Sequence, residues 1–115
     1  MAAARAAGGD PDDIIRKVAA AIADDIQSRG FRGCAFLNAA AEYPDRDHPV
    51  HQVVIAHRQW FLDTLTGLLG DEPTARHFVM LRDGAMAAGC LFDPTLICET
   101  FLHAVDELLR SAGRQ

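Results

Sequence analysis

The stretch FRGCAFLNAAAEYPDRDHPVH, residues 31–51, decides the fold because it contains one complete short helix and the start of a longer one. Its alanine-rich first half predicts a helix that begins at Cys34, since alanine loses no side-chain entropy on entering a helix. Pro44 ends this helix, because a proline disfavours the helical conformation in the residue before it. Asp47 or His48 can cap the next helix, and Pro49 suits its first position, so the sequence predicts that this helix begins here.

Outward from this stretch, prolines and glycines bracket the other helices in the same way. The first helix is predicted to run from Pro11 to Gly30 and the last from Pro94 to Gly113. The five predicted helices cover residues 11–30, 34–43, 48–70, 73–91 and 94–113. Apolar residues recur at helical spacing in the longer segments, and the β-branched and aromatic runs typical of strands are scarce. The sequence therefore predicts an all-α fold of about five helices.

Length and charge limit what such a domain can do. A chain of 115 residues is long enough for one core, so residues 1–10 are expected to be a flexible lead-in and residues 11–113 a single domain. The net charge is −5, with 16 acidic and 11 basic residues. Proteins that grip nucleic acids need clustered Lys and Arg, which are scattered here. We therefore expect no direct nucleic-acid binding by this chain.

Cysteine usage and hydropathy indicate a cytoplasmic protein. The three cysteines are odd in number and show no C-x-x-C spacing, so a disulfide framework is not expected and a reducing compartment fits best. No segment has the length and apolarity of a membrane span, and the N-terminus lacks the apolar core of a signal peptide. Arginine in preference to lysine, together with abundant alanine and glycine, is typical of proteins from GC-rich bacterial genomes.

The last two predicted helices carry small and apolar residues in a pattern that favours close pairing. Residues 84–89 include two glycines and three alanines, and a glycine inside a helix costs about 1 kcal/mol relative to alanine. This cost is usually offset where another helix approaches closely. The final helix has two adjoining apolar rows, wider than one neighbouring helix covers. It is either an ordinary buried helix of a monomer or part of a four-helix bundle between two subunits, and the width of the face favours the homodimer.

The densest polar cluster, residues 42–51, is predicted to be structural. Asp47, His48 and His51 are residue types that ligate metals, but their spacing matches no familiar metal motif. Capping of the third helix by Asp47 or His48 explains the same residues more simply. We therefore predict no metal and no cofactor.

Two polar residues lie among apolar neighbours. His57 is predicted to fall within the apolar stripe of the third helix, and Asn38 lies among alanines in the short second helix. Each is either a core residue satisfied by one hydrogen bond or a polar anchor in a ligand cavity.

No catalytic residue stands out. The two serines lie near helix ends, outside any nucleophile elbow, and no glycine-rich phosphate loop is present. Cys34 opens a helix, whose dipole can lower a thiol pKa, but a buried structural cysteine accounts for it as well. We therefore predict that the chain is not an enzyme. The alternative is a small helical metal- or thiol-dependent enzyme that uses Asp47, His48, His51 or Cys34.

Several segments together resemble a known family. Residues 31–45 and 47–51, followed by His57-Arg58, are similar to the pattern G-C-x-F-x-N-A-x-x-E-[FY]-P-D…H-P-V, found in the C-terminal regulatory domains of TetR/AcrR-type bacterial transcriptional repressors. Residues 81–85, LRDGA, resemble the L-x-D-G-A stretch of their penultimate helix. The first pattern is long and specific, the second is short, and the resemblance covers residues 11–109.

The resemblance implies both a fold and a role. In that family the last two helices pair across a two-fold axis into a four-helix bundle, and the earlier helices surround a cavity for a small, often apolar effector. Effector binding repositions two DNA-binding heads, and the repressor leaves its operator. The implied dimer contacts are Leu81, Gly84, Ala88, Phe101, Val105 and Leu108. The implied pocket-lining residues are Phe36, Asn38, His57, Trp60 and Phe61.

The chain also departs from the family pattern. The family's N-terminal helix-turn-helix and the long joining helix have no counterpart, because only ten residues precede the first predicted helix. We therefore expect that the chain does not bind an operator by itself and that its cavity lacks one wall. A shortened gene product, a cut fragment and a head-less paralogue are all compatible with this pattern.

Overall fold

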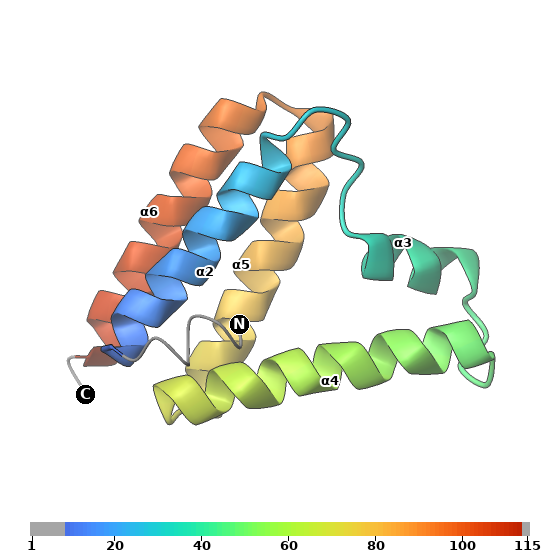
Figure 1. Ribbon diagram of the computed structural model, residues 1–115, viewed down its shortest axis with the longest axis horizontal. Coiled ribbons are helices and arrows are strands. Elements are labelled where there is room, and N and C mark those ends of the chain that lie inside the picture. The colour runs from blue at the N-terminus through green and yellow to red at the C-terminus, as the bar shows by residue number, and fades with distance from the viewer. Residues whose placement is uncertain (1–8, 114–115) are drawn as a thin grey trace.

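Five α-helices and no strand make up residues 9–113, the part of the chain that the computed structural model describes (Figure 1). The helices are α2 (Pro11–Ile26), α3 (Ala35–Glu42), α4 (Pro49–Leu69), α5 (Glu72–Leu91) and α6 (Pro94–Gly113). The predicted all-α fold of five helices is therefore confirmed. Most of the predicted lead-in, residues 1–8, lies outside the described residues. None of the five helices is long and apolar enough to cross a membrane.

Most helix ends lie where the sequence predicts them. His48 caps α4, because its Nδ1 atom accepts a hydrogen bond of 3.1 Å from the backbone N–H of Val50. Gly70 ends the same helix in the left-handed conformation, with φ 72°, which costs a glycine little. The capping role predicted for the histidine is confirmed by this contact.

The predicted end of the first helix is wrong. Helix α2 ends at Ile26 and not at Gly30. The backbone N–H and the hydroxyl of Ser28 both donate to the carbonyl of Asp25, at 3.0 and 2.5 Å, and this tight turn takes the chain out of the helix. Gly30, with φ 78°, belongs to the turn that follows.

Helices α2, α5 and α6 run alongside one another as a three-helix bundle, and α4 crosses it at one end (Figure 1). Helix α2 packs against both α5 and α6, and α4 packs mainly against α5. Helix α3 lies beside α4, joined to α2 by the loop of residues 27–34. This arrangement leaves the space between α2, α3, α4 and α5 as the place where a cavity can form.

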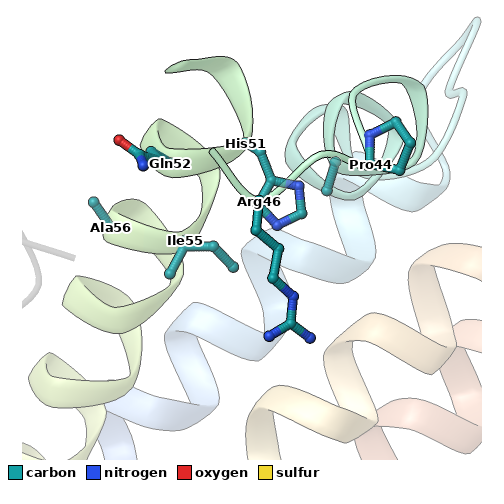
Figure 2. Close-up of a pocket in the computed structure, with 7 residues that line it drawn as sticks. Pro44, Arg46, His51, Gln52, Ile55 and Ala56 are labelled. Atoms are coloured by element: carbon teal, nitrogen blue, oxygen red, sulfur yellow. The ribbon is translucent and has the colours of Figure 1, made fainter. Parts of the chain in front are cut away.

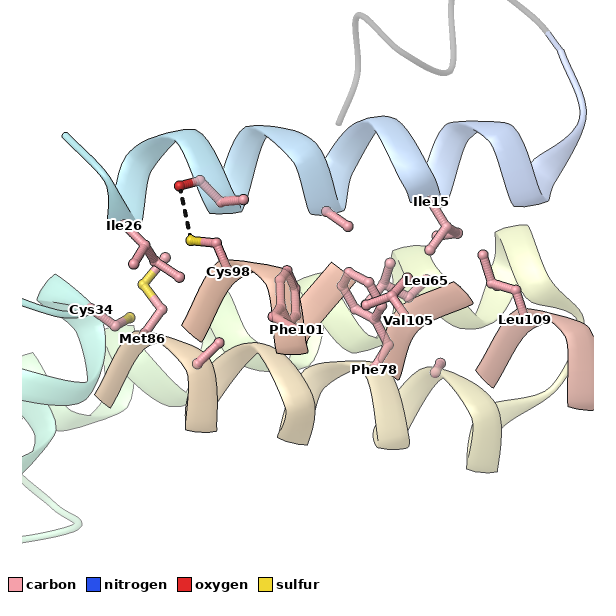
Figure 3. Close-up of a cluster of buried hydrophobic side chains, with 14 residues drawn as sticks. Ile15, Ile26, Cys34, Leu65, Phe78, Met86, Cys98, Phe101, Val105 and Leu109 are labelled. Atoms are coloured by element: carbon pink, nitrogen blue, oxygen red, sulfur yellow. Dashed lines mark hydrogen bonds between the residues drawn. The ribbon is translucent and has the colours of Figure 1, made fainter. Parts of the chain in front are cut away.

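The core lies between α2 on one side and α5 and α6 on the other (Figure 3). Ile15 of α2 and Leu65 of α4 are fully buried there, beside Phe78 of α5. Phe78 and Phe101 meet with ring centroids 6.3 Å apart and ring planes inclined by 57°, an arrangement that aromatic pairs favour. Val105 is also part of this core, at 2% exposure.

The two glycines of residues 84–89 have different surroundings. A Cβ atom at Gly89 would lie 2.6 Å from Cγ2 of Ile26, closer than real Cβ atoms approach a neighbour. Gly89 therefore allows α2 and α5 to touch within one chain. A Cβ atom at Gly84 would meet nothing within 4 Å. The tight contact that the small residues predict is formed inside the chain at Gly89, whereas Gly84 faces open space.

Candidate functional site

A cavity of about 190 Å³ lies where α2, α3, α4 and α5 meet. Its wall combines apolar side chains with two arginines, a histidine and a cysteine. The lining residues are Val18, Ile22, Cys34, Phe36, His57, Arg58, Phe61 and Arg82. This composition, apolar with a few polar groups, is typical of small-molecule sites.

Aromatic stacking holds α3 against α4 at one side of the cavity. The rings of Phe36 and His57 are parallel, with centroids 3.9 Å apart and planes inclined by 6°. Trp60 follows one turn later, its ring centroid 5.6 Å from that of His57, and it is 51% exposed. The histidine ring therefore lies flat on the phenylalanine at the surface of the protein and is not part of the core.

A chain of polar contacts that includes two lining residues of the cavity, Arg58 and Arg82, links three elements. Asp83 accepts from Arg82 through Oδ1, at 3.0 Å from Nη1, and from Arg58 through Oδ2. Arg82 also donates through Nη2 to the sulfur of Cys34, 3.2 Å away. The two guanidinium side chains are 17% and 26% exposed, so both are largely removed from water. The contacts join α4 to α5, and α5 to the start of α3.

The thiol of Cys34 has an altered acidity. Burial raises its pKa, but hydrogen bonds from the backbone of Leu37, from the Arg82 guanidinium and from the backbone of Phe36 lower it, as does the positive charge of Arg82. The lowering contributions together outweigh burial, so the pKa of Cys34 lies below its ordinary value of 9.0. The site therefore favours negative charge at the sulfur.

Of the residues proposed for the pocket, the structure brings three together. Phe36, His57 and Phe61 line the cavity. Asn38 is exposed, and its Nδ2 atom donates to the carbonyl of Arg32 at 3.0 Å, so it holds the loop before α3. Trp60 lies beside the cavity wall and is not part of it.

The two arginines are the residues that the sequence argument missed. Arg58 lies four residues after Val54, a buried residue of α4, and seven residues before Leu65, another. That helical spacing was a usable signal for an inward position. Arg82 was visible only as part of the family-like stretch LRDGA, because its partners come from other elements.

A second hollow, of about 270 Å³, is the groove between α5 and α6. Four of the six residues implied at a dimer contact line it, namely Leu81, Gly84, Ala88 and Phe101. Val105 points into the core of its own chain, because its row on α6 faces α2 and α5, so a partner cannot reach it. Leu108 lies outside this groove, in a smaller hollow beside the start of α5.

A third hollow, of about 830 Å³, is wide and open and lies between the loop after α3 and the outer face of α4 (Figure 2). One of its polar residues, His51, takes part in local structure. A ring nitrogen of His51 lies 2.9 Å from the carbonyl oxygen of Tyr43, and the Tyr43 ring stacks on His48 at 4.5 Å. Within residues 9–113, no three His, Cys, Asp or Glu side chains gather as ligands for a metal ion would.

Comparison with known proteins identifies the fold. No protein-family model matches the chain, and no curated protein matches it. Among solved structures, a TetR-family transcriptional regulator from Streptomyces coelicolor is 60% identical in sequence and superposes with a TM-score of 0.91. The match covers 96% of this chain and 58% of that regulator, so the chain spans less than two thirds of its relative. The chain therefore belongs to the TetR family of transcriptional regulators.

Proposed function

We propose that this chain is the effector-binding and dimerisation domain of a bacterial, cytoplasmic TetR-family regulator and does not bind an operator by itself. The observation that carries the effector part is the cavity between α2, α3, α4 and α5, whose wall is apolar except for a few placed polar groups. Its volume of about 190 Å³ compares with the roughly 150 Å³ that accommodates a benzene molecule in an engineered cavity. The effector therefore buries about one aromatic ring or a short chain there.

A thermal-shift screen with small aromatic and aliphatic compounds tests the effector proposal. A ligand that binds the folded state raises its apparent stability, so some compounds should raise the melting temperature. Val18→Phe puts a ring into the cavity and should abolish these shifts, whereas Val53→Phe, at an exposed position of α4, should leave them unchanged. Equal shifts in both variants, or none in the unaltered protein, would contradict the proposal.

The dimerisation part rests on the groove between α5 and α6. Met80 is 68% exposed at its edge, Leu96 is 58% exposed near the start of α6, and Gly84 leaves open space in the groove itself. Exposed apolar groups next to a small-residue groove are what two helix pairs need to form a four-helix bundle. In the proposed homodimer, α5 and α6 of one chain pack against the same two helices of the second chain.

Sedimentation velocity at tens of micromolar tests this interface. We expect a dimer, and Gly84→Leu should weaken it because the added side chain overpacks the groove. Gly67→Leu, a glycine of α4 that also has nothing within 4 Å, is the matched control and should leave the dimer intact. A strictly monomeric unaltered protein would overturn the dimer, and an unaffected Gly84→Leu dimer would move the interface elsewhere.

The proposal assigns operator contact to another part of the regulator and assigns no reaction to this chain. A net charge of −5 disfavours binding to the phosphate backbone. Two histidines that would suit a metal-dependent enzyme, His48 and His51, have local structural contacts. Cys34, the candidate for a thiol-dependent enzyme, contacts an arginine and has no histidine base among its hydrogen-bond partners within the described residues.

A further inference from the structure

We propose that the ligand of the cavity between α2, α3, α4 and α5 carries a carboxylate, held by Arg58 and Arg82, on a small apolar body. This inference rests on the proposed function, since it names the chemical class of the effector. It sharpens the expectation of a merely apolar effector.

The charges around the cavity do not balance. The wall contains the two guanidinium groups, and among the described residues no carboxylate lines it. Asp83, which lies behind the wall, is shared by both arginines, one carboxylate oxygen for each. One negative charge therefore serves two positive charges whose side chains are only 26% and 17% exposed. A charge in such a place is stabilised by a counter-charge, and an anionic ligand supplies it.

The arginines also have donors to spare. A guanidinium has five N–H donors, and the hydrogen bonds within residues 9–113 engage one nitrogen of Arg58 and two of Arg82. No side-chain nitrogen or oxygen in this part of the chain is both fully buried and without a partner. The guanidinium nitrogens without a partner are therefore not fully buried, so a ligand can approach them. Paired N–H groups of a guanidinium match the two oxygens of a carboxylate.

Cys34 accepts a hydrogen bond from Arg82 that the carboxylate of the ligand would accept better. A thiol sulfur is a poor acceptor compared with a carboxylate oxygen, yet it receives an N–H of Arg82 at 3.2 Å. The lowered pKa of this thiol has the same origin, because the nearby guanidinium favours negative charge. A carboxylate that takes over this N–H removes part of the stabilisation of the thiolate. Cys34 then reports on the occupancy of the site.

The remainder of the wall selects the body of the ligand. Val18 and Ile22 of α2 and Phe61 of α4 provide apolar surface beside the guanidinium groups. Burial of apolar surface favours binding. A ligand with one aromatic ring and one carboxylate therefore satisfies both parts of the wall.

Three compounds of almost the same shape test the inference: benzoate, benzamide and benzamidinium, which carry charges of −1, 0 and +1. We would titrate each into the unaltered chain and follow binding by protein NMR. Benzoate should bind about ten-fold or more tightly than benzamide, the change expected for a charge-assisted pair, and benzamidinium should bind worst. Arg58→Gln and Arg82→Gln should each reduce the preference for benzoate. Arg76→Gln, on an exposed face of α5, should preserve it.

The outcomes separate this inference from the proposed function. Benzamide binding as tightly as benzoate would overturn the anionic ligand and leave an apolar effector cavity in place. Binding of none of the three would also overturn it, and the broader screen would then decide whether the cavity binds anything. A second readout needs no variant. Benzoate should raise the pH at which alkylation of Cys34 is half-maximal, and benzamide should not, whereas simple occlusion slows the reaction without moving that midpoint.

Discussion

Asp83 is the residue on which the chain of polar contacts at the cavity depends, since it pairs with arginines from two helices. Asp83→Asn removes the only negative charge known to serve both groups within the described residues and leaves two guanidinium groups close together. We expect the free energy of unfolding to fall by about 1–3 kcal/mol, less than for a fully buried pair because the side chain is partly exposed. Urea denaturation measures the change.

An exposed ion pair on the same helix provides the control. Nη1 of Arg76 lies 2.9 Å from Oε1 of Glu72, four residues earlier on the helix, and each side chain is more than half exposed. Glu72→Gln should therefore change the stability by less than about 0.5 kcal/mol. Equal effects of Asp83→Asn and Glu72→Gln would show that the Asp83 contacts contribute no more than surface pairs do.

The acidity of Cys34 should depend on Arg82. Burial raises the pKa of the thiol, and the guanidinium is one of the groups that lower it, so Arg82→Gln should move the alkylation midpoint of Cys34 to higher pH. Mass spectrometry of alkylated peptides measures Cys34 separately from Cys98, whose pKa is raised by burial and by the charge of Asp24. An unchanged Cys34 midpoint would contradict the assigned cause.

The same shift makes stability depend on pH in a definite direction. The folded-state pKa of Cys34 is lowered from the ordinary value of 9.0 for a free thiol, which is taken for the unfolded chain. The thiolate therefore stabilises the folded state fully above the unfolded pKa, and this contribution is lost as the pH falls through the folded pKa. Cys34→Ala should remove this part of the pH dependence from urea denaturation curves recorded between neutral and alkaline pH.

The family resemblance, rather than residue types or helical spacing, suggested most of the candidate cavity residues. Phe36, His57 and Phe61 line the cavity, as the family resemblance implies. Successive side chains on a helix point about 100° apart. Arg58, the neighbour of His57, therefore takes the inward position. An inward arginine is improbable until its partner is known, and Asp83 lies 25 positions further along the chain. No local pattern contains that information.

At the level of helices, Gly89 and Gly67 make a matched pair. Gly89→Ala brings a methyl group against Ile26, so we expect the protein to lose about 1–3 kcal/mol of stability through overpacking. Gly67→Ala, where a methyl group meets nothing within 4 Å, should gain about 0.5–1 kcal/mol from the higher helix propensity of alanine. Thermal denaturation of both variants measures the two stability changes, which should have opposite signs. Stabilisation by Gly89→Ala would mean that α2 and α5 are not in close contact.

Helix boundaries were predictable wherever a side chain or a proline sets them locally. Asp71 caps α5 by accepting the N–H of Thr74, and Gly70 ends α4 by its left-handed conformation. The end of α2 was not predictable in this way. Ser28 competes with the helix through hydrogen bonds to a backbone carbonyl, and nothing in the residue types says that this turn prevails over continued helix as far as Gly30.

For the whole molecule, dimerisation should couple stability to concentration. If two chains pair through α5 and α6, the apparent melting temperature rises with protein concentration, because only the folded chain is bound. Met80→Glu, at an exposed position beside the groove, should abolish this dependence by placing a charge in the interface. Val53→Glu, similarly exposed on α4, should retain it. Calorimetry over a range of concentrations distinguishes the two variants.

Arg82 and Gly84 are two residues apart on α5, and roughly 200° apart around its axis. One borders the cavity and the other the groove, so the two proposed sites are separated by the thickness of a single helix, about 10 Å. The helix is therefore a shared wall of the cavity and the groove. A change that admits a new ligand on one side alters the pairing surface on the other, so we expect shifts in effector preference among relatives to be accompanied by compensating changes along α6.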